Sequence, residues 1–376
     1  MIRLLVYIDN SLGKLFDRIE PATAVGTEQL SAFRIFFGIL MLLYFLPSWS
    51  WLNEVPEGFF DPYLLSFAYL TEDFPPPSIF TFLDVTVIIL LLLVTLGIYT
   101  RKSLLLLYVI SGVLFSYSFS FGKIDHYTNL FLFSYPVLAF TNSGTKFALL
   151  PDRKLSEKTQ KTSLIVLGII IAFGYFTAGL AKCLEWVDFD LSTNGFLDWI
   201  FYCFFHSENQ SLLAPYLFSI PQFILEPLDY LAALFEISGF FFLFKGKKYW
   251  VFYLTIASIF HLTNLIFFNL SFALNTLCYG IFIVSPILSI IAKKNKPISK
   301  KWIRWLVGLS ITVAFVKIVQ ISTDLPVYNY HNYTPLVHIE LFVDLVLWLF
   351  TISCGIFLLS LGKTNLHRVA KGEMMK

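Results

Sequence analysis

Ten long apolar segments, separated by short polar stretches, constrain the fold of this chain more than any other feature of its sequence. They cover roughly residues 29–47, 79–98, 103–121, 126–141, 162–183, 227–244, 249–268, 271–292, 303–320 and 337–361. Most of them approach the ~20 residues that an α-helix needs to cross a bilayer. Because backbone in lipid must satisfy its own hydrogen bonds, the segments predict an all-α bundle of about ten transmembrane helices.

The composition supports a polytopic membrane protein and argues against other classes. Of the 376 residues, 57% are hydrophobic and 14% are charged, and the mean hydropathy of +0.72 exceeds that of soluble domains. The net charge of +2 gives no reason to expect nucleic acid as a partner. No nucleotide-binding loop is present, and the four cysteines show no metal-binding spacing, although Cys183 and Cys203 could form a disulfide.

Lysine and arginine residues gather in every second loop, which predicts how the segments are oriented. Under the positive-inside rule, this alternation places both termini and residues 142–161 in the cytoplasm. Residues 48–78 and 184–226 then face outward, and the latter stretch contains two apolar pieces that suit interfacial or re-entrant helices. We expect a multi-pass protein of the cell (inner or plasma) membrane.

The same pattern divides the chain into four parts. An amphipathic segment on the cytoplasmic face, residues 1–28, precedes a transmembrane domain at 29–292 that includes the outer loop 184–226. Two additional transmembrane helices follow at 303–361, and a basic cytoplasmic tail occupies 362–376.

A lysine at the outer end of the fifth segment is the strongest candidate for a functional group. In the stretch GYFTAGLAKCLEW (174–186), Tyr175, Gly179 and Lys182 recur at helical spacing and so share one stripe. A charged side chain costs roughly 2.5 to 3.5 kcal/mol at the bilayer centre and less near its edge. Lys182 is therefore either functional or a structural lysine whose amine reaches the headgroups.

Most other polar residues within the segments also fall in their outer halves, which predicts a polar cavity open to the outside. The set comprises Asp84, His126, Asp229, His261, Asn264, Lys317, His338, Glu340 and Asp344. The simpler alternative is that each histidine is paired with a neighbour and that the carboxylates neutralise buried cations. Arg34 lies near the inner end of its segment and Glu236 near mid-depth, so we expect structural charges, with Arg34 bound to Glu236 or to headgroups.

Five stretches resemble, in the same order, the membrane domain of vitamin K-dependent gamma-carboxylases and their bacterial relatives, called the HTTM (horizontally transferred transmembrane) domain. They lie at 30–47, 124–133 (IDHYTNLFLF), 175–187 (YFTAGLAKCLEWV), 234–244 and 260–288, within roughly residues 25–290. The resemblance implies that Lys182 is the base that deprotonates a hydroquinone. It also implies that His126, His261 and Asn264, the last two in an FH-x-x-N motif, occupy functional positions of the family.

The resemblance leads to two hypotheses of function. In the first, a reduced quinone (a vitamin K-like hydroquinone) is the cofactor of a carboxylase- or oxygenase-like enzyme. There, neutral Lys182 accepts a proton, and His126, His261 and Asn264 form hydrogen bonds to the developing oxyanions. The candidates for binding substrate or lipid are Asn264, Tyr175, Gly179, Asp84, Asp229 and Glu340. Because the carboxylase continues into a long extracytoplasmic domain and this sequence ends soon after its tenth segment, glutamate carboxylation is not expected.

In the second hypothesis, the protein is a non-catalytic maturation, chaperone or transport component that binds membrane lipid, a secreted peptide or a thioredoxin-like partner.

Overall fold

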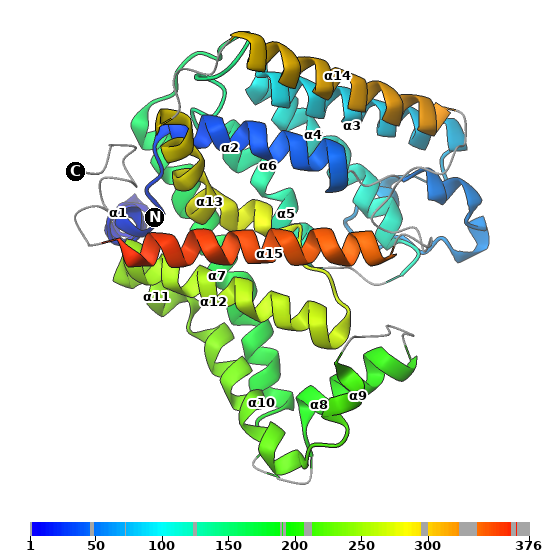
Figure 1. Ribbon diagram of the computed structural model, residues 1–376, viewed down its shortest axis with the longest axis vertical. Helices are drawn as coiled ribbons and strands as arrows, with labels where there is room; N and C mark the ends of the chain where they lie inside the picture. The colour runs from blue at the N-terminus through cyan, green and yellow to red at the C-terminus, as the bar shows by residue number, and fades with distance from the viewer. Residues whose placement is uncertain are drawn as a thin grey trace. The chain divides into compact units, whose positions relative to one another are not determined.

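The computed structural model describes most of the chain, and the regular elements of that part are helices (Figure 1). The described residues are 2–45, 49–71, 73–122, 126–188, 190, 193–206, 213–294, 300–322, 337–361 and 366. Within these ranges, β pairing is limited to an isolated parallel bridge between Ile98 and Leu150. The described part of the chain is therefore all-helical, as its apolar segments predict.

Each of the ten apolar segments contains helix. In chain order the corresponding elements are α2 (Thr27–Leu40) with its π-helical continuation η1 (Met41–Phe45), α3 (Pro77–Leu96), α4 (Thr100–Phe119), α5 (His126–Leu132) with α6 (Ser134–Ala139), α7 (Glu157–Glu185), α10 (Gln222–Ile237) with α11 (Gly239–Lys245), α12 (Lys247–Phe268), α13 (Asn275–Lys294), α14 (Lys300–Ser322) and α15 (Val337–Ser360). The remaining elements are α1 (Ile2–Thr23), the short helices η2 (Ser50–Glu54), η3 (Glu57–Phe59) and η4 (Ala68–Leu70), and α8 (Gly195–Phe201), η5 (Tyr202–His206) and α9 (Ala214–Leu217).

Six of the described helices are long and apolar enough to cross a membrane, and the number becomes seven if α10 and α11 form one bent span. The six stretches are Thr27–Tyr44, Ser78–Leu96, Thr100–Phe119, Glu157–Glu185, Lys247–Phe268 and Leu341–Ser360. Three other predicted segments have shorter described apolar helices, at Leu130–Ala139, Asn275–Ile291 and Val307–Val319. The chain is thus a multi-pass membrane protein with at least six spans by helix length and composition.

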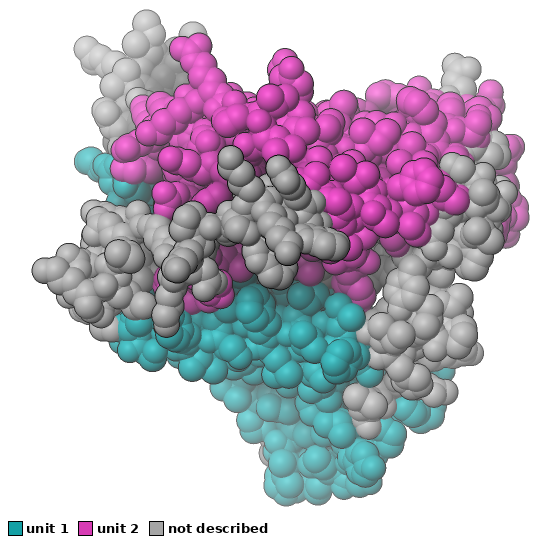
Figure 2. Space-filling view, turned by 45° about the horizontal axis from the view of Figure 1, so that its top comes forward, with its two compact units in different colours: residues 1–24, 164–284, 338–376 teal, residues 25–163, 285–337 magenta. Residues whose placement is uncertain are grey.

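The helices form two compact units, each assembled from separate stretches of the chain (Figure 2). Unit 1 consists of Met1–Ala24, Leu164–Val284 and His338–Lys376. Unit 2 consists of Val25–Ser163 and Ser285–Val337, and in it α3 packs against α2, α4 and α14. In unit 1, α1 packs against α11 and α12; this helix, in the predicted amphipathic segment, buries Ile19 and exposes Lys14.

A bend of 46° separates α10 from α11 in unit 1. It occurs at a serine and a glycine, a combination that commonly kinks helices, and the Ser238 hydroxyl donates a hydrogen bond to the carbonyl of Phe235 at 2.6 Å. A Cβ atom on Gly239 would lie 3.0 Å from the hydroxyl oxygen of Tyr253, so the glycine lets α12 come close at the bend. Glu236 therefore lies in the last turn of α10, directly before the change in direction.

A small helical cap, formed by α8, η5 and α9, comes from the predicted outer loop. Its apolar core contains Ile200 and Cys203 from the cap together with Leu225 of α10 and Phe268 of α12. Asn194 is the N-cap residue of α8, and its side-chain oxygen accepts a hydrogen bond from the backbone N–H of Leu197 at 2.7 Å. The cap is therefore a packed part of unit 1 rather than an irregular loop.

Candidate functional site

The predicted stripe on α7 is present as one face of a continuous helix. Tyr175 and Gly179 are buried on this face, and the side chain of Lys182, one turn further, is 20% exposed. Helix α7 is continuous from Glu157 to Glu185, and Gly174 lies on another side, where a Cβ atom would meet no heavy atom within 4 Å. The tyrosine, the glycine and the amine therefore face the interior of unit 1 together.

An ion pair joins Lys182 to α10. Its Nζ atom donates a hydrogen bond to Oε2 of Glu236 at 2.7 Å, and the glutamate side chain is only 4% exposed. The same amine lies 5.1 Å from the ring centre of Trp186, within cation–π range. A carboxylate and an indole face both favour a positively charged amine. Lys182 therefore has the surroundings of an ammonium group, which differs from the neutral amine that the general-base hypothesis requires.

Gly179 lets the two helices of this pair approach each other. A Cβ atom built on it would lie 2.8 Å from both the Cβ atom of Glu236 and the backbone nitrogen of Ile237. Contacts this short to helix backbone cannot be relieved by rotating a side chain. A glycine at this position is therefore required for α10 to lie where Glu236 reaches Lys182.

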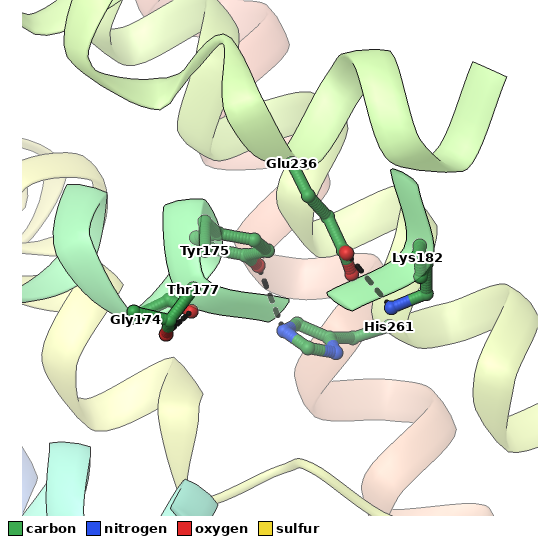
Figure 3. Close-up of polar contacts among 6 residues, drawn as sticks. All are labelled: Gly174, Tyr175, Thr177, Lys182, Glu236 and His261. Atoms are coloured by element: carbon green, nitrogen blue, oxygen red, sulfur yellow. Dashed lines mark hydrogen bonds and ion pairs between the residues drawn. The ribbon is translucent and has the colours of Figure 1, made fainter. Parts of the chain in front are cut away.

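A second polar cluster joins α7, α12 and α13. The hydroxyl oxygen of Tyr175 lies 2.8 Å from Nε2 of His261 and 2.8 Å from the hydroxyl oxygen of Tyr279. The third side of this triangle, between His261 Nε2 and the Tyr279 hydroxyl, measures 3.0 Å. Figure 3 shows Tyr175, His261, Lys182 and Glu236 converging on one region from their helices. We call these four residues together with Tyr279 the polar core of unit 1.

Aromatic rings surround the polar core. The ring of His261 lies 4.8 Å from that of Phe272, and it is roughly parallel to the ring of Trp348 on α15 at 5.3 Å. Tyr253 packs against Tyr175, with ring centres 5.5 Å apart. Rings at these separations exclude water from the polar groups between them.

Three polar atoms of this region are buried without a hydrogen-bond partner among the described residues. They are Nδ1 of His261, the hydroxyl oxygen of Tyr253 and Nε1 of Trp348. Buried polar groups are normally paired, because an unpaired one costs roughly 1 to 3 kcal/mol. These atoms therefore retain unused hydrogen-bonding capacity beside a set of flat ring surfaces.

The other predicted site residue of unit 1 whose bonding is defined has a structural role. Both carboxylate oxygens of Asp229 on α10 accept hydrogen bonds from the start of α8, one from the backbone N–H of Gly195 at 2.8 Å and one from that of Phe196 at 2.9 Å. A carboxylate is favoured at a helix N-terminus, where backbone N–H groups are unpaired. Asp229 thus holds the helical cap against α10.

Asp84 and Arg34 belong to unit 2 and make defined hydrogen bonds within it. Asp84 accepts the backbone N–H of Trp49 at 3.0 and 3.1 Å. Arg34, fully buried, donates to the carbonyl of Phe147 and to the hydroxyl of Thr100, the latter at 3.5 Å. The described partner of Glu236 is Lys182, so the expected pairing of Arg34 with Glu236 is not found.

The remaining predicted residues are only partly described. His126 is the first residue of α5, in unit 2, and its side chain lies outside the described residues, as do the side chain of Glu340 and the tail at 362–376 apart from Leu366. Asn264 is half-buried one turn after His261 on α12.

Cys183 and Cys203 are both free thiols, so the possible disulfide is absent.

Tyr279, Tyr253 and Trp348 are the members of this region that sequence reasoning missed. Tyr279 has a usable signal, since it follows Asn275 by one helical turn within an apolar segment. Tyr253 and Trp348 have none, because the chain contains 42 Phe, 19 Tyr and 8 Trp, and aromatic residues are also expected at lipid-facing and interfacial positions.

Comparison with protein-family models, curated proteins and solved structures found no match to this chain. The fold and the site define its class, a multi-pass helical membrane protein with a buried polar core in one of its two units.

Proposed function

We propose that unit 1 binds a quinone or quinol lipid at the polar core and acts on it as a vitamin K-dependent carboxylase-like enzyme of the HTTM type. The observation that carries the proposal is the juxtaposition of two polar arrangements inside one aromatic shell. These are the hydrogen-bonded cluster of Tyr175, His261 and Tyr279 and the ion pair of Lys182 with Glu236.

The chemistry of a quinol matches these groups. Its ring is flat and apolar and would stack on aromatic side chains, as His261 and Trp348 do on each other. Its two oxygen atoms need hydrogen-bond partners in a dry environment, which Nδ1 of His261 and the hydroxyl of Tyr253 can offer. Removal of one of its protons leaves an anion, which the ammonium group of Lys182 would stabilise.

The sequence resemblance supports the same site independently, since Lys182 and His261 occupy the positions that it marks as functional. In this proposal, the Lys182–Glu236 pair supplies the proton-accepting group and His261 orients the ring oxygen. The alternative is a non-catalytic maturation, chaperone or transport component, in which the same site binds a lipid or a secreted peptide without acting on it.

Lipid analysis of the purified protein separates the two functions. We expect about one quinone to co-purify with each protein molecule in mild detergent, and His261→Ala to lose it. Thr263→Ala is the matched control, because Thr263 lies exposed on the same helix and its hydroxyl bonds only to its own helix. Mass spectrometry that finds phospholipid but no quinone in the wild-type protein would favour the non-catalytic function.

We also propose that all ten segments cross the cell membrane, with both termini in the cytoplasm and the polar core in the outer half. The support is the alternation of basic loops under the positive-inside rule. In a cysteine-free background, a membrane-impermeant thiol reagent added to whole cells should label Thr193→Cys and spare Ser156→Cys. Both positions are exposed, so accessibility within the protein does not bias the comparison. Labelling of Ser156→Cys but not of Thr193→Cys would indicate the opposite orientation in the membrane.

A further inference from the structure

We infer that Glu236, rather than Lys182, is the group that takes the proton from the quinol, and that Lys182 stays charged to hold the resulting anion. The inference rests on the proposed quinol binding and assigns the proton-accepting role within the ion pair.

The surroundings of Lys182 argue against the amine as the acceptor. It faces a carboxylate oxygen at 2.7 Å and the Trp186 ring at 5.1 Å, and its side chain is the more exposed of the pair. All three conditions stabilise the ammonium form, through opposite charge, the negative face of the ring and hydration. An ammonium group has three donors and no lone pair, so it cannot accept a proton.

The surroundings of Glu236 suit an acceptor. Its carboxylate uses Oε2 for Lys182, and no described residue donates to Oε1, which keeps its lone pairs for another proton. The side chain is only 4% exposed, so most of the carboxylate is shielded from bulk water. The neighbouring residue Phe235 packs against Tyr175, with ring centres 5.6 Å apart. This contact places the end of α10 next to the hydrogen-bonded cluster. Figure 3 shows the carboxylate pointing into the region that Tyr175, His261 and Lys182 share.

The step balances without an additional reactant. The O–H bond of one quinol hydroxyl breaks, the proton forms a bond to Oε1 of Glu236, and the electron pair remains on the quinol oxygen as a phenolate. Before the step, the ammonium of Lys182 is balanced by the Glu236 carboxylate; after it, the same ammonium is balanced by the phenolate. The net charge of the buried site is unchanged, which avoids the cost of creating an isolated charge away from water.

Spectroscopy on three proteins tests the assignment. A prenylated naphthohydroquinone is added without oxygen to the wild type, Glu236→Gln and Lys182→Arg, and binding, phenolate absorbance and the infrared C=O band of a protonated glutamate are recorded. We expect all three proteins to bind the probe. Wild type and Lys182→Arg should form phenolate together with the glutamic acid band, because arginine remains a cation. Glu236→Gln should form less phenolate by about tenfold or more and show no such band, because an amide is a poor base.

The opposite pattern overturns the inference. Phenolate at the wild-type level in Glu236→Gln, or its loss in Lys182→Arg with binding intact, would assign the proton to the lysine and leave quinol binding standing. Failure of the wild type to bind the probe would overturn the proposed function as well as the inference. If Glu236→Gln is unstable, the double variant Lys182→Met with Glu236→Gln removes both charges and should bind the probe without forming phenolate; phenolate there would also refute the role of Glu236.

Discussion

Lys182→Met should lower the free energy of unfolding by about 3 kcal/mol, because it leaves Glu236 as a buried carboxylate without its cation. Glu236→Gln should cost less, since the partly exposed amine of Lys182 can turn toward water or the headgroups. The double variant should be more stable than Lys182→Met, because it contains no unpaired charge. Unfolding in SDS, followed by circular dichroism, measures all three.

The double-mutant cycle then gives the coupling between the two side chains, which we expect to exceed about 1 kcal/mol. Lys158→Met is the matched control, since Lys158 lies exposed on the same helix and its loss should change stability by no more than about 0.5 kcal/mol. Strictly additive effects of the two single substitutions would contradict the ion pair.

Gly179→Ala should destabilise the protein by about 1 to 3 kcal/mol, because its methyl group would overlap the backbone of α10. The substitution forces α10 away from α7 and lengthens the contact between Lys182 and Glu236. Loss of the co-purified ligand should accompany the loss of stability.

Gly174→Ala provides the comparison on the same helix. No atom lies within 4 Å of the position that its Cβ would take, and alanine favours helix over glycine by up to about 1 kcal/mol. The Gly174 variant should therefore be at least as stable as the wild type. If Gly179→Ala were as stable as Gly174→Ala in a thermal unfolding assay, the close contact between α7 and α10 would be contradicted.

The sequence predicts the helices of this protein well, because an apolar run of about 20 residues has few alternatives in a membrane. The stripe of Tyr175, Gly179 and Lys182 is also predicted, because helical spacing alone defines it. All ten segments contain helix, although fewer than ten pass as spans on length and composition in the described residues.

The partners of the polar residues could not be predicted in the same way. The position of a polar residue along its helix can be predicted from the sequence. Which other helix packs against that residue depends on the tertiary structure. Arg34 was therefore expected to bind Glu236 or headgroups, while the structure pairs Glu236 with Lys182. Asp229 was expected to bind substrate or lipid or to neutralise a buried cation; its bonds to the N-terminus of α8 could not be predicted as well, because they depend on a chain reversal across the predicted outer loop.

The ion pair also bears on how the chain enters the membrane during synthesis. Lys182 leaves the ribosome 54 residues ahead of Glu236, so α7 reaches the bilayer carrying a charge whose partner does not yet exist. Helix α10 in turn brings a carboxylate that is costly to place in lipid alone. We therefore expect each helix to stabilise the other in the bilayer, with the charge of Lys182 unpaired until α10 has been made.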